Sequence, residues 1–201
     1  MSFFHYRDFV TKCRKCLINS GYVLLQKKDV FCATCLSDYC NHKFRSTIGK
    51  SRILGPGHKV LVGVSNSINS SVLVDFVKIG LSEDIHRKIR FDVSFVYVDE
   101  CILCNEHCNG CTLPFSLFEQ MYESGVDCYF TTLQNCLHAQ SIPMLKVSLA
   151  DGEYSTKNQF ENVHNFLSTT SSEVNSFLKC FNSLRSLNLK QNFICRLRLV
   201  H

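Results

Sequence analysis

The chain has 201 residues, of which 45% are hydrophobic and 19% charged, with thirteen cysteines and a formal net charge of +5. It opens without an apolar stretch and small-residue cleavage site, and it contains no run of about eighteen apolar residues, which argues against a secreted or membrane-spanning protein. We therefore expect a reducing, cytoplasmic compartment, in which so many cysteines point to metal binding or free thiols.

The charge is distributed unevenly along the chain. Residues 1–60 hold eleven Lys and Arg against three acidic residues, a net +8, whereas the remainder carries −3. A basic N-terminal segment followed by a slightly acidic remainder favours a polyanionic partner, with nucleic acid as the first candidate. A solvated basic surface without a partner would give the same pattern, and charge alone does not separate the two.

Two C-x-x-C pairs near the N-terminus give the strongest signal. Fifteen residues separate them, the spacing at which two short loops close a tetrahedron of thiolates around one zinc ion. Redox dithiols are the main alternative, but they usually occur singly after a strand. Residues 17–31 are long enough for a small hairpin with Gly21 at or near its turn. The pattern predicts a zinc-ribbon-like module with structural zinc on Cys13, Cys16, Cys32 and Cys35.

Residues 42–52 follow the cysteines and predict a short helix. Phe44 and Ile48 stand four apart, and basic residues surround them. A Gly-Pro-Gly break at residues 55–57 then separates a zinc-binding module with its basic helix, residues 1–54, from an α/β domain, residues 58–201. If the helix binds RNA, the candidate phosphate contacts are Lys43, Arg45, Lys50 and Arg52.

The second domain alternates strands and helices. The apolar run at residues 59–64 predicts a strand buried on both faces of a parallel sheet. A helix at 72–81 and a strand at 91–98 complete a βαβ unit, and further strands are expected at 126–132 and 143–149. Helices are expected at 114–123, 159–167 and 172–184. This order predicts an open parallel α/β sheet.

A serine-rich loop follows the first strand, where α/β sheets bind ligands. Its hydroxyls and the helix amides could hold a phosphate, or they could cap the helix, which on the residues alone is the favoured interpretation. The residues in question are Ser65, Asn66, Ser67, Asn69, Ser70 and Ser71.

A second cysteine cluster follows the strand at 91–98. Four thiols within eleven residues, with His107 among them, can wrap one metal ion, although many such loops hold none. The candidate ligands are Cys101, Cys104, Cys108 and Cys111.

The order of these features resembles a known family. Two C-x-x-C pairs, an HKFR-containing basic helix followed by GKSR, KVLVGVS with a serine-rich turn, and a strand ending FVYVDE are similar to the cytoplasmic tRNA 2-thiolation protein 2 family. The resemblance is clearest over residues 10–100 and weaker to about residue 190. It implies a PP-loop fold of the adenine nucleotide alpha hydrolase type, incomplete here because family members are longer, so that the chain is expected to be a truncated member.

The resemblance also implies a function. Family members are accessory subunits that form a heterodimer with a catalytic thiolase subunit, and they support sulfur transfer to the wobble uridine of cytosolic tRNAs. The sulfur comes from a thiocarboxylated ubiquitin-like modifier. PP-loop enzymes bind ATP through a Ser-Gly-Gly-x-Asp-Ser turn, whose counterpart here is residues 65–70. Both glycines and the aspartate are missing, which argues against ATP chemistry and for a non-catalytic subunit.

Two alternatives to this function remain open. One is an active ATP-dependent tRNA-modifying enzyme, which would require the altered loop to bind ATP. The other is a zinc-ribbon nucleic-acid-binding protein whose α/β domain only mediates protein contacts.

Overall fold

The computed structural model of the chain describes residues 11–25, 27–82, 88–103, 113–137, 142–149, 155–168, 181–184 and 186. These residues belong to two compact units. The first contains the chain up to Gly55 together with Ile79–Ile89, and the second contains Pro56–Lys78 and the chain from Arg90 onward. Among the helices that the structure describes, none is long and apolar enough to cross a bilayer.

The first unit begins with two small antiparallel strand pairs. Strand β1 (Thr11–Lys12) pairs with β2 (Ser20–Gly21), and β3 (Val23–Leu25) pairs with β4 (Asp29–Phe31). The turn between β3 and β4 includes Lys27, whose φ of 61° lies in the left-handed region, and the Lys28 amide donates to the Leu25 carbonyl at 3.0 Å. A hairpin between the two cysteine pairs is therefore present, as the sequence predicts.

The expected position of Gly21 is wrong. Gly21 lies in β2 opposite Thr11, and not in the turn of the hairpin. A Cβ atom at this position would lie 2.6 Å from Cγ1 of Val30 and 3.3 Å from its carbonyl carbon. Glycine is needed here because two backbone segments approach each other closely, whereas the turn is made by a lysine with positive φ.

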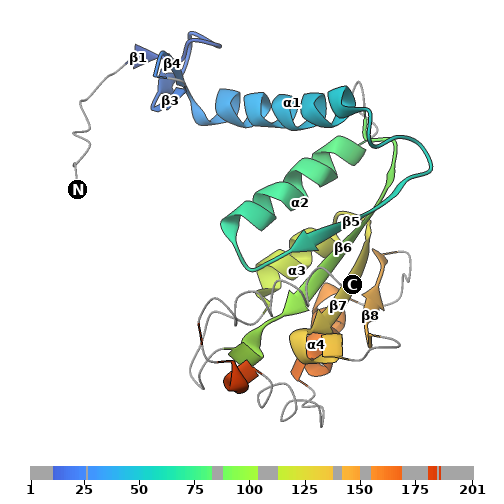
Figure 1. The fold of residues 1–201 in the computed structure, drawn as a ribbon. Helices are drawn as coiled ribbons and strands as arrows, with labels where there is room; N and C mark the ends of the chain where they lie inside the picture. The colour runs from blue at the N-terminus through green and yellow to red at the C-terminus, as the bar shows by residue number, and fades with distance from the viewer. Residues whose placement is uncertain are drawn as a thin grey trace. The chain divides into compact units, whose positions relative to one another are not determined.

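Helix α1 (Ala33–Ser51) is much longer than the sequence predicts. It begins directly after Cys32, whose extended backbone (φ −79°, ψ 165°) is the N-cap, and it ends before Arg52 in the left-handed region at φ 52°. Neither glycine nor proline interrupts residues 33–48, so the helix continues unbroken from the second cysteine pair to the basic residues. Figure 1 shows α1 running on from the small strands.

The second unit is an α/β domain with a four-stranded sheet in the order β5-β6-β7-β8. The predicted α/β class and the β5–α2–β6 unit are confirmed, and α3 and α4 follow in the expected places (Figure 1). The bounds are β5 (Lys59–Val64), α2 (Ile68–Leu81), β6 (Asp92–Asp99), α3 (Phe115–Tyr122), β7 (Asp127–Thr132), β8 (Leu145–Val147) and α4 (Thr156–Ser168), with short 3-10 helices at Cys101–Leu103 and Leu133–Leu137.

The sheet is mixed, which corrects the expectation of a purely parallel one. Strands β5, β6 and β7 are parallel, but β8 runs antiparallel to β7, with Phe130 opposite Leu145. A parallel return needs a crossover of a dozen or more residues, usually with an α-helix. The helix described in the twelve-residue connection between Thr132 and Leu145 is the short 3-10 helix Leu133–Leu137 and not an α-helix of that kind.

The expectation that β5 is buried on both faces is also wrong. In the described sheet β5 is an edge strand, and Lys59, Leu61 and Gly63 are exposed while Val64 is buried. Leu61 has 56% of its surface exposed to solvent. The apolar composition of the run indicated two covered faces, but composition does not reveal that a strand lies at the edge.

The core of the second unit lies between the sheet and helices α3 and α4. Phe118 of α3 is fully buried, with its ring centroid 5.8 Å from that of Phe130 on β7 and 5.5 Å from that of Phe160 on α4. Helix α2 is tied to α3 because the side-chain amide of Gln120 donates to Ser71 and to Asp75. The aromatic contacts hold α4 against α3 and beside β7.

Candidate metal centre and basic helix

The four N-terminal cysteines converge on one point. Their sulfur atoms all lie within 4.8 Å of one another, and the Cys16 and Cys32 sulfurs are 3.9 Å apart. A zinc ion with Zn–S bonds of about 2.3 Å in a tetrahedron separates its sulfurs by about 3.8 Å. Cys13, Cys32 and Cys35 are buried and none of the four forms a disulfide. The arrangement can hold one metal ion, and it joins both pairs in one cluster, unlike two separate redox dithiols.

Local folding brings these sulfurs together. The Cys13 amide donates to the Asn19 carbonyl at 2.8 Å, which folds the first pair into a tight loop between β1 and β2. The second pair stands at the start of α1, where the Leu36 amide donates to the Cys32 carbonyl at 2.9 Å. The side-chain amide of Asn19 lies 3.9 Å from the Cys32 sulfur and can donate to a thiolate there.

The electrostatics of the cysteine cluster favour the binding of a cation. Burial raises the pKa of the Cys13 thiol, but backbone amides of Cys16, Cys32 and Lys15 outweigh this and lower it to about 6. Burial, followed by the neighbouring thiols, raises the pKa of Cys35 to about 12. Thiols packed this closely cannot all ionise without a compensating positive charge, and a bound divalent metal supplies that charge.

Helix α1 distributes its basic side chains over two sides. Lys43 and Lys50 are seven residues apart and share one side, whereas Arg45 lies roughly 140° around the helix from Lys50. Lys43 has its ammonium 5.5 Å from the centroid of the Tyr39 ring, and the Arg45 Nε donates to the Asn41 carbonyl at 3.5 Å. Arg52 follows the helix and is exposed. The four predicted contacts therefore do not form one continuous row.

The described acidic residues near the cysteine cluster, Asp29 and Asp38, are already paired. Asp29 forms an ion pair with Arg14, and Asp38 forms one with Lys15 at 3.2 Å. Neither carboxylate neutralises Lys43 or Lys50. That side of α1 therefore carries positive charge available to a polyanion.

The serine-rich loop is closed by its own hydroxyls. The Ser65 Oγ lies 3.0 Å from Ser67 Oγ and 2.9 Å from Ser70 Oγ, and the Ser70 amide donates to Ser67 Oγ at 3.3 Å. Ser67 thus caps the first turn of α2, as the favoured sequence interpretation has it. Asn69, Ser70 and Ser71 lie within α2. A role for this loop in nucleotide binding stays a prediction.

The second cysteine cluster lies largely outside the described residues. Cys101 begins a short 3-10 helix after β6 and is half-buried. Cys104, Cys108 and Cys111 belong to the part of the chain that the structure does not describe. The proposed second metal therefore stays a prediction.

Comparison with known proteins identifies relatives for about half of the chain. It is 40% identical over 92 residues to cytoplasmic tRNA 2-thiolation protein 2 of Xenopus tropicalis, 38% over 93 residues to that of Danio rerio and 38% over 95 residues to that of Homo sapiens. The matched part is homologous to cytoplasmic tRNA 2-thiolation protein 2. The resemblance predicted from the sequence is thereby confirmed for that part.

The match covers 46–47% of this chain and 18–19% of each of these relatives. No protein-family model matches the chain. The homology to cytoplasmic tRNA 2-thiolation protein 2 thus concerns about a fifth of the length of the relatives.

Sequence reasoning missed several residues that shape these sites. Tyr39, which lies beneath the Lys43 ammonium, could have been found from its position four residues earlier on the helix. Asn19 next to the Cys32 sulfur had no signal beyond its place inside the first loop. His164 on α4 lines a cavity with Asp99, a juxtaposition that depends on the tertiary fold.

Proposed function

We propose that this chain acts in the 2-thiolation of the wobble uridine of cytosolic tRNAs, as an accessory, tRNA-contacting subunit located in the cytoplasm. The observation that carries the proposal is the homology to cytoplasmic tRNA 2-thiolation protein 2. The cysteine cluster and the basic side of α1 give that role a physical basis. In this proposal a structural zinc ion on the four cysteines fixes the start of α1, and the helix presents Lys43 and Lys50 to tRNA phosphates.

The chemistry is assigned to a partner. We propose a heterodimer with a catalytic thiolase subunit, which receives sulfur from a thiocarboxylated ubiquitin-like modifier. The β5–loop–α2 segment has the strand, serine-rich turn and helix of a PP-loop domain, which supports assignment to that fold. Its hydroxyls bond to one another, and Asn66 and Ser67 place side chains where the PP-loop turn has glycine. We therefore expect no ATP turnover by this chain alone.

A tRNA titration at several salt concentrations tests the contact side of α1. Each phosphate neutralised by a Lys or Arg contributes somewhat less than one unit to the slope of log K against log salt. The double variant Lys43→Ala/Lys50→Ala should therefore reduce the slope by between one and two units. Arg45→Ala on the other side of the helix is the matched control and should change the slope by much less. Equal slopes for all three proteins would remove α1 from the RNA-binding surface.

A thiolation assay tests the assignment itself. The chain should co-purify with a catalytic thiolase subunit and raise its formation of 2-thiouridine on tRNA. If the chain binds a hairpin RNA of equal length as tightly as tRNA and has no effect on thiolation, the zinc-ribbon nucleic-acid-binding alternative is favoured. ATP hydrolysis by the purified chain would instead favour the enzyme alternative.

A further inference from the structure

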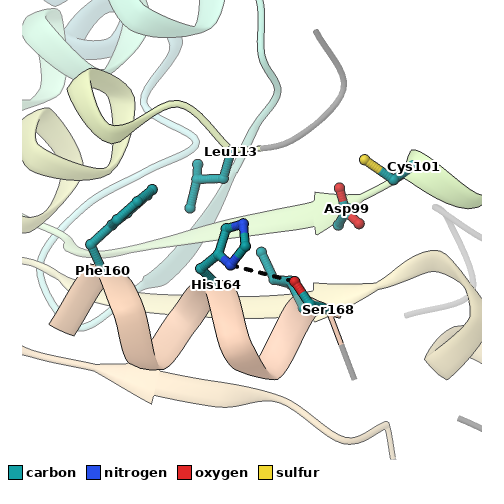
Figure 2. Close-up of a pocket in the computed structure, with 7 residues that line it drawn as sticks. Asp99, Cys101, Leu113, Phe160, His164 and Ser168 are labelled. Carbon is teal, nitrogen blue, oxygen red and sulfur yellow. Dashed lines mark hydrogen bonds between the residues drawn. The ribbon is translucent and has the colours of Figure 1, made fainter. Parts of the chain in front are cut away.

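A cavity of about 110 Å³ lies at the carboxyl end of β6, against helix α4. Figure 2 shows that its lining comes from both elements and from the segment before α3. One part of the wall is apolar and the other carries groups that can bond to a ligand. The lining residues are Asp99, Cys101, Leu113, Phe160, His164, Leu167 and Ser168.

The Asp99 carboxylate is the feature of the cavity that needs explanation. It is buried, with 6% of its surface exposed, and its Oδ1 atom has no hydrogen-bond donor among the described residues. Burial raises the pKa of this carboxyl group, while hydrogen bonds from the side chain and backbone of Cys101 act in the opposite direction. An acceptor left unpartnered at such a depth costs free energy unless a ligand donates to it.

The other polar groups lie along the same wall. Figure 2 shows His164 and Ser168 on α4, where the His164 Nδ1 and the Ser168 Oγ are 3.5 Å apart. Within the described residues, the groups spaced closely enough to hold a metal ion are the four N-terminal cysteines, and Asp99, Cys101 and His164 do not form such a group among themselves. An anion is disfavoured by the carboxylate. A ligand that brings an N–H or O–H donor fits the unpaired acceptor.

We propose that this cavity binds a small organic amine in its ammonium form, with the N–H group donating to Asp99 Oδ1 and a short hydrocarbon stem against Phe160, Leu113 and Leu167. A charged donor to a carboxylate is roughly twice as strong as a neutral one, so the ammonium is preferred over an alcohol. The Phe160 ring adds a surface that attracts cations. A cavity of about 150 Å³ holds benzene, so a stem of about four carbons suits this smaller one. The proposal does not depend on a role in tRNA thiolation.

Three ligands of equal length test the proposal on the full chain. We would titrate isotopically labelled protein with butylammonium, 1-butanol and butyrate and follow its NMR spectrum. Butylammonium should bind at least about tenfold more tightly than butanol, a difference of about 1.4 kcal/mol. Butyrate should bind most weakly. The Asp99 carboxyl carbon should shift with butylammonium and much less with butanol.

Two variants locate the preference. In Asp99→Asn the affinities for butylammonium and butanol should come within about twofold of each other. In Asp127→Asn, which removes an exposed carboxylate at the other end of the sheet that pairs with Lys146 at 2.8 Å, the tenfold preference should persist. If Asp99→Asn fails to fold, the carboxyl shift in the unmodified chain still decides. Equal binding of all three ligands, an unmoved Asp99 carbon, or no saturable binding of the amine would overturn the proposal.

Discussion

The sulfur atoms of Cys16 and Cys32 lie 3.9 Å apart although sixteen positions separate the two residues in the chain. Cys16 belongs to the loop after β1 and Cys32 is the N-cap of α1, so this contact joins that loop to the start of the helix. We expect the metal to be part of the fold, since binding free energy at such a site is also folding free energy.

Replacing Cys16 with Ser should therefore abolish stoichiometric zinc. The purified chain should contain about one zinc ion, and the variant should lose it together with the ordered structure of the first unit. Elemental analysis and circular dichroism measure the two effects. Cys40→Ser is the matched control, because Cys40 lies on α1 outside the cluster and should leave the zinc content unchanged.

Gly21→Ala should destabilise the first unit. The new Cβ would lie 2.6 Å from Val30 Cγ1, and overpacking of this kind typically costs about 1–3 kcal/mol. Gly49→Ala on α1 is the control, because nothing lies within 4 Å of the added atom. That change should stabilise the helix by about 0.5–1 kcal/mol. Urea unfolding of both variants with zinc present distinguishes the two signs, and a stable Gly21→Ala protein would contradict the packing of β2.

The Asp99 carboxyl group should destabilise the folded chain at neutral pH and cease to do so in acid, the reverse of an ion-paired carboxylate. Burial raises the pKa of its carboxyl group in the folded chain above the unfolded value, so the folded state binds the proton more tightly. The unfavourable contribution of the carboxylate is fully present above the folded pKa and disappears as the pH falls to the unfolded value near 4. Asp99→Asn should thus raise the melting temperature at pH 7 and have little effect near pH 4.

Asp127 supplies the opposite case for the same measurement. A hydrogen bond from Lys146 lowers the pKa of the Asp127 carboxyl group, so its stabilising effect is present above the unfolded pKa and is lost as the pH falls through the folded value. Both partners are substantially exposed. Asp127→Asn should therefore lower stability at pH 7 by no more than about 1 kcal/mol. A larger loss for Asp127→Asn than for a core variant would contradict this.

Cys128 should resist alkylation in the native chain. It is buried on β7, and burial raises the pKa of its thiol to about 12, so almost no thiolate exists at pH 8. Iodoacetamide labelling followed by mass spectrometry should leave Cys128 unmodified until urea unfolds the second unit. Rapid labelling without urea would show that β7 opens locally.

The elements that were predicted well have strong local signals. The spacing of Cys13, Cys16, Cys32 and Cys35 predicted one cluster, because short loops allow few other arrangements of the thiols. The β-branched run of β5 and the proline before α3 located those elements closely. Each of these signals lies within a few residues of the structure it predicts.

The features that were missed depend on distant parts of the chain. Leu61 is exposed on the edge strand β5, and β8 runs antiparallel to β7. The cavity beside Asp99 forms because the aromatic contact between Phe118 and Phe160 holds α4 near the end of β6. No local pattern in the sequence reports these long-range contacts.

The unbroken helix α1 connects the cysteine cluster to the basic residues at its other end. The helix runs unbroken from Cys35, inside the cysteine cluster, to Lys50 in its last turn, a rise of roughly 22 Å. Most of the stability of a helix in a protein comes from tertiary packing, so the first turn of α1 depends on the cluster for an anchor. Removing the metal with a chelator should destabilise α1 from its first turn. The basic side chains near its last turn, such as Lys50, would then lose their fixed arrangement. The affinity of the chain for a polyanion would then depend on whether the cysteine cluster holds a metal ion, although Lys50 does not contact the cluster.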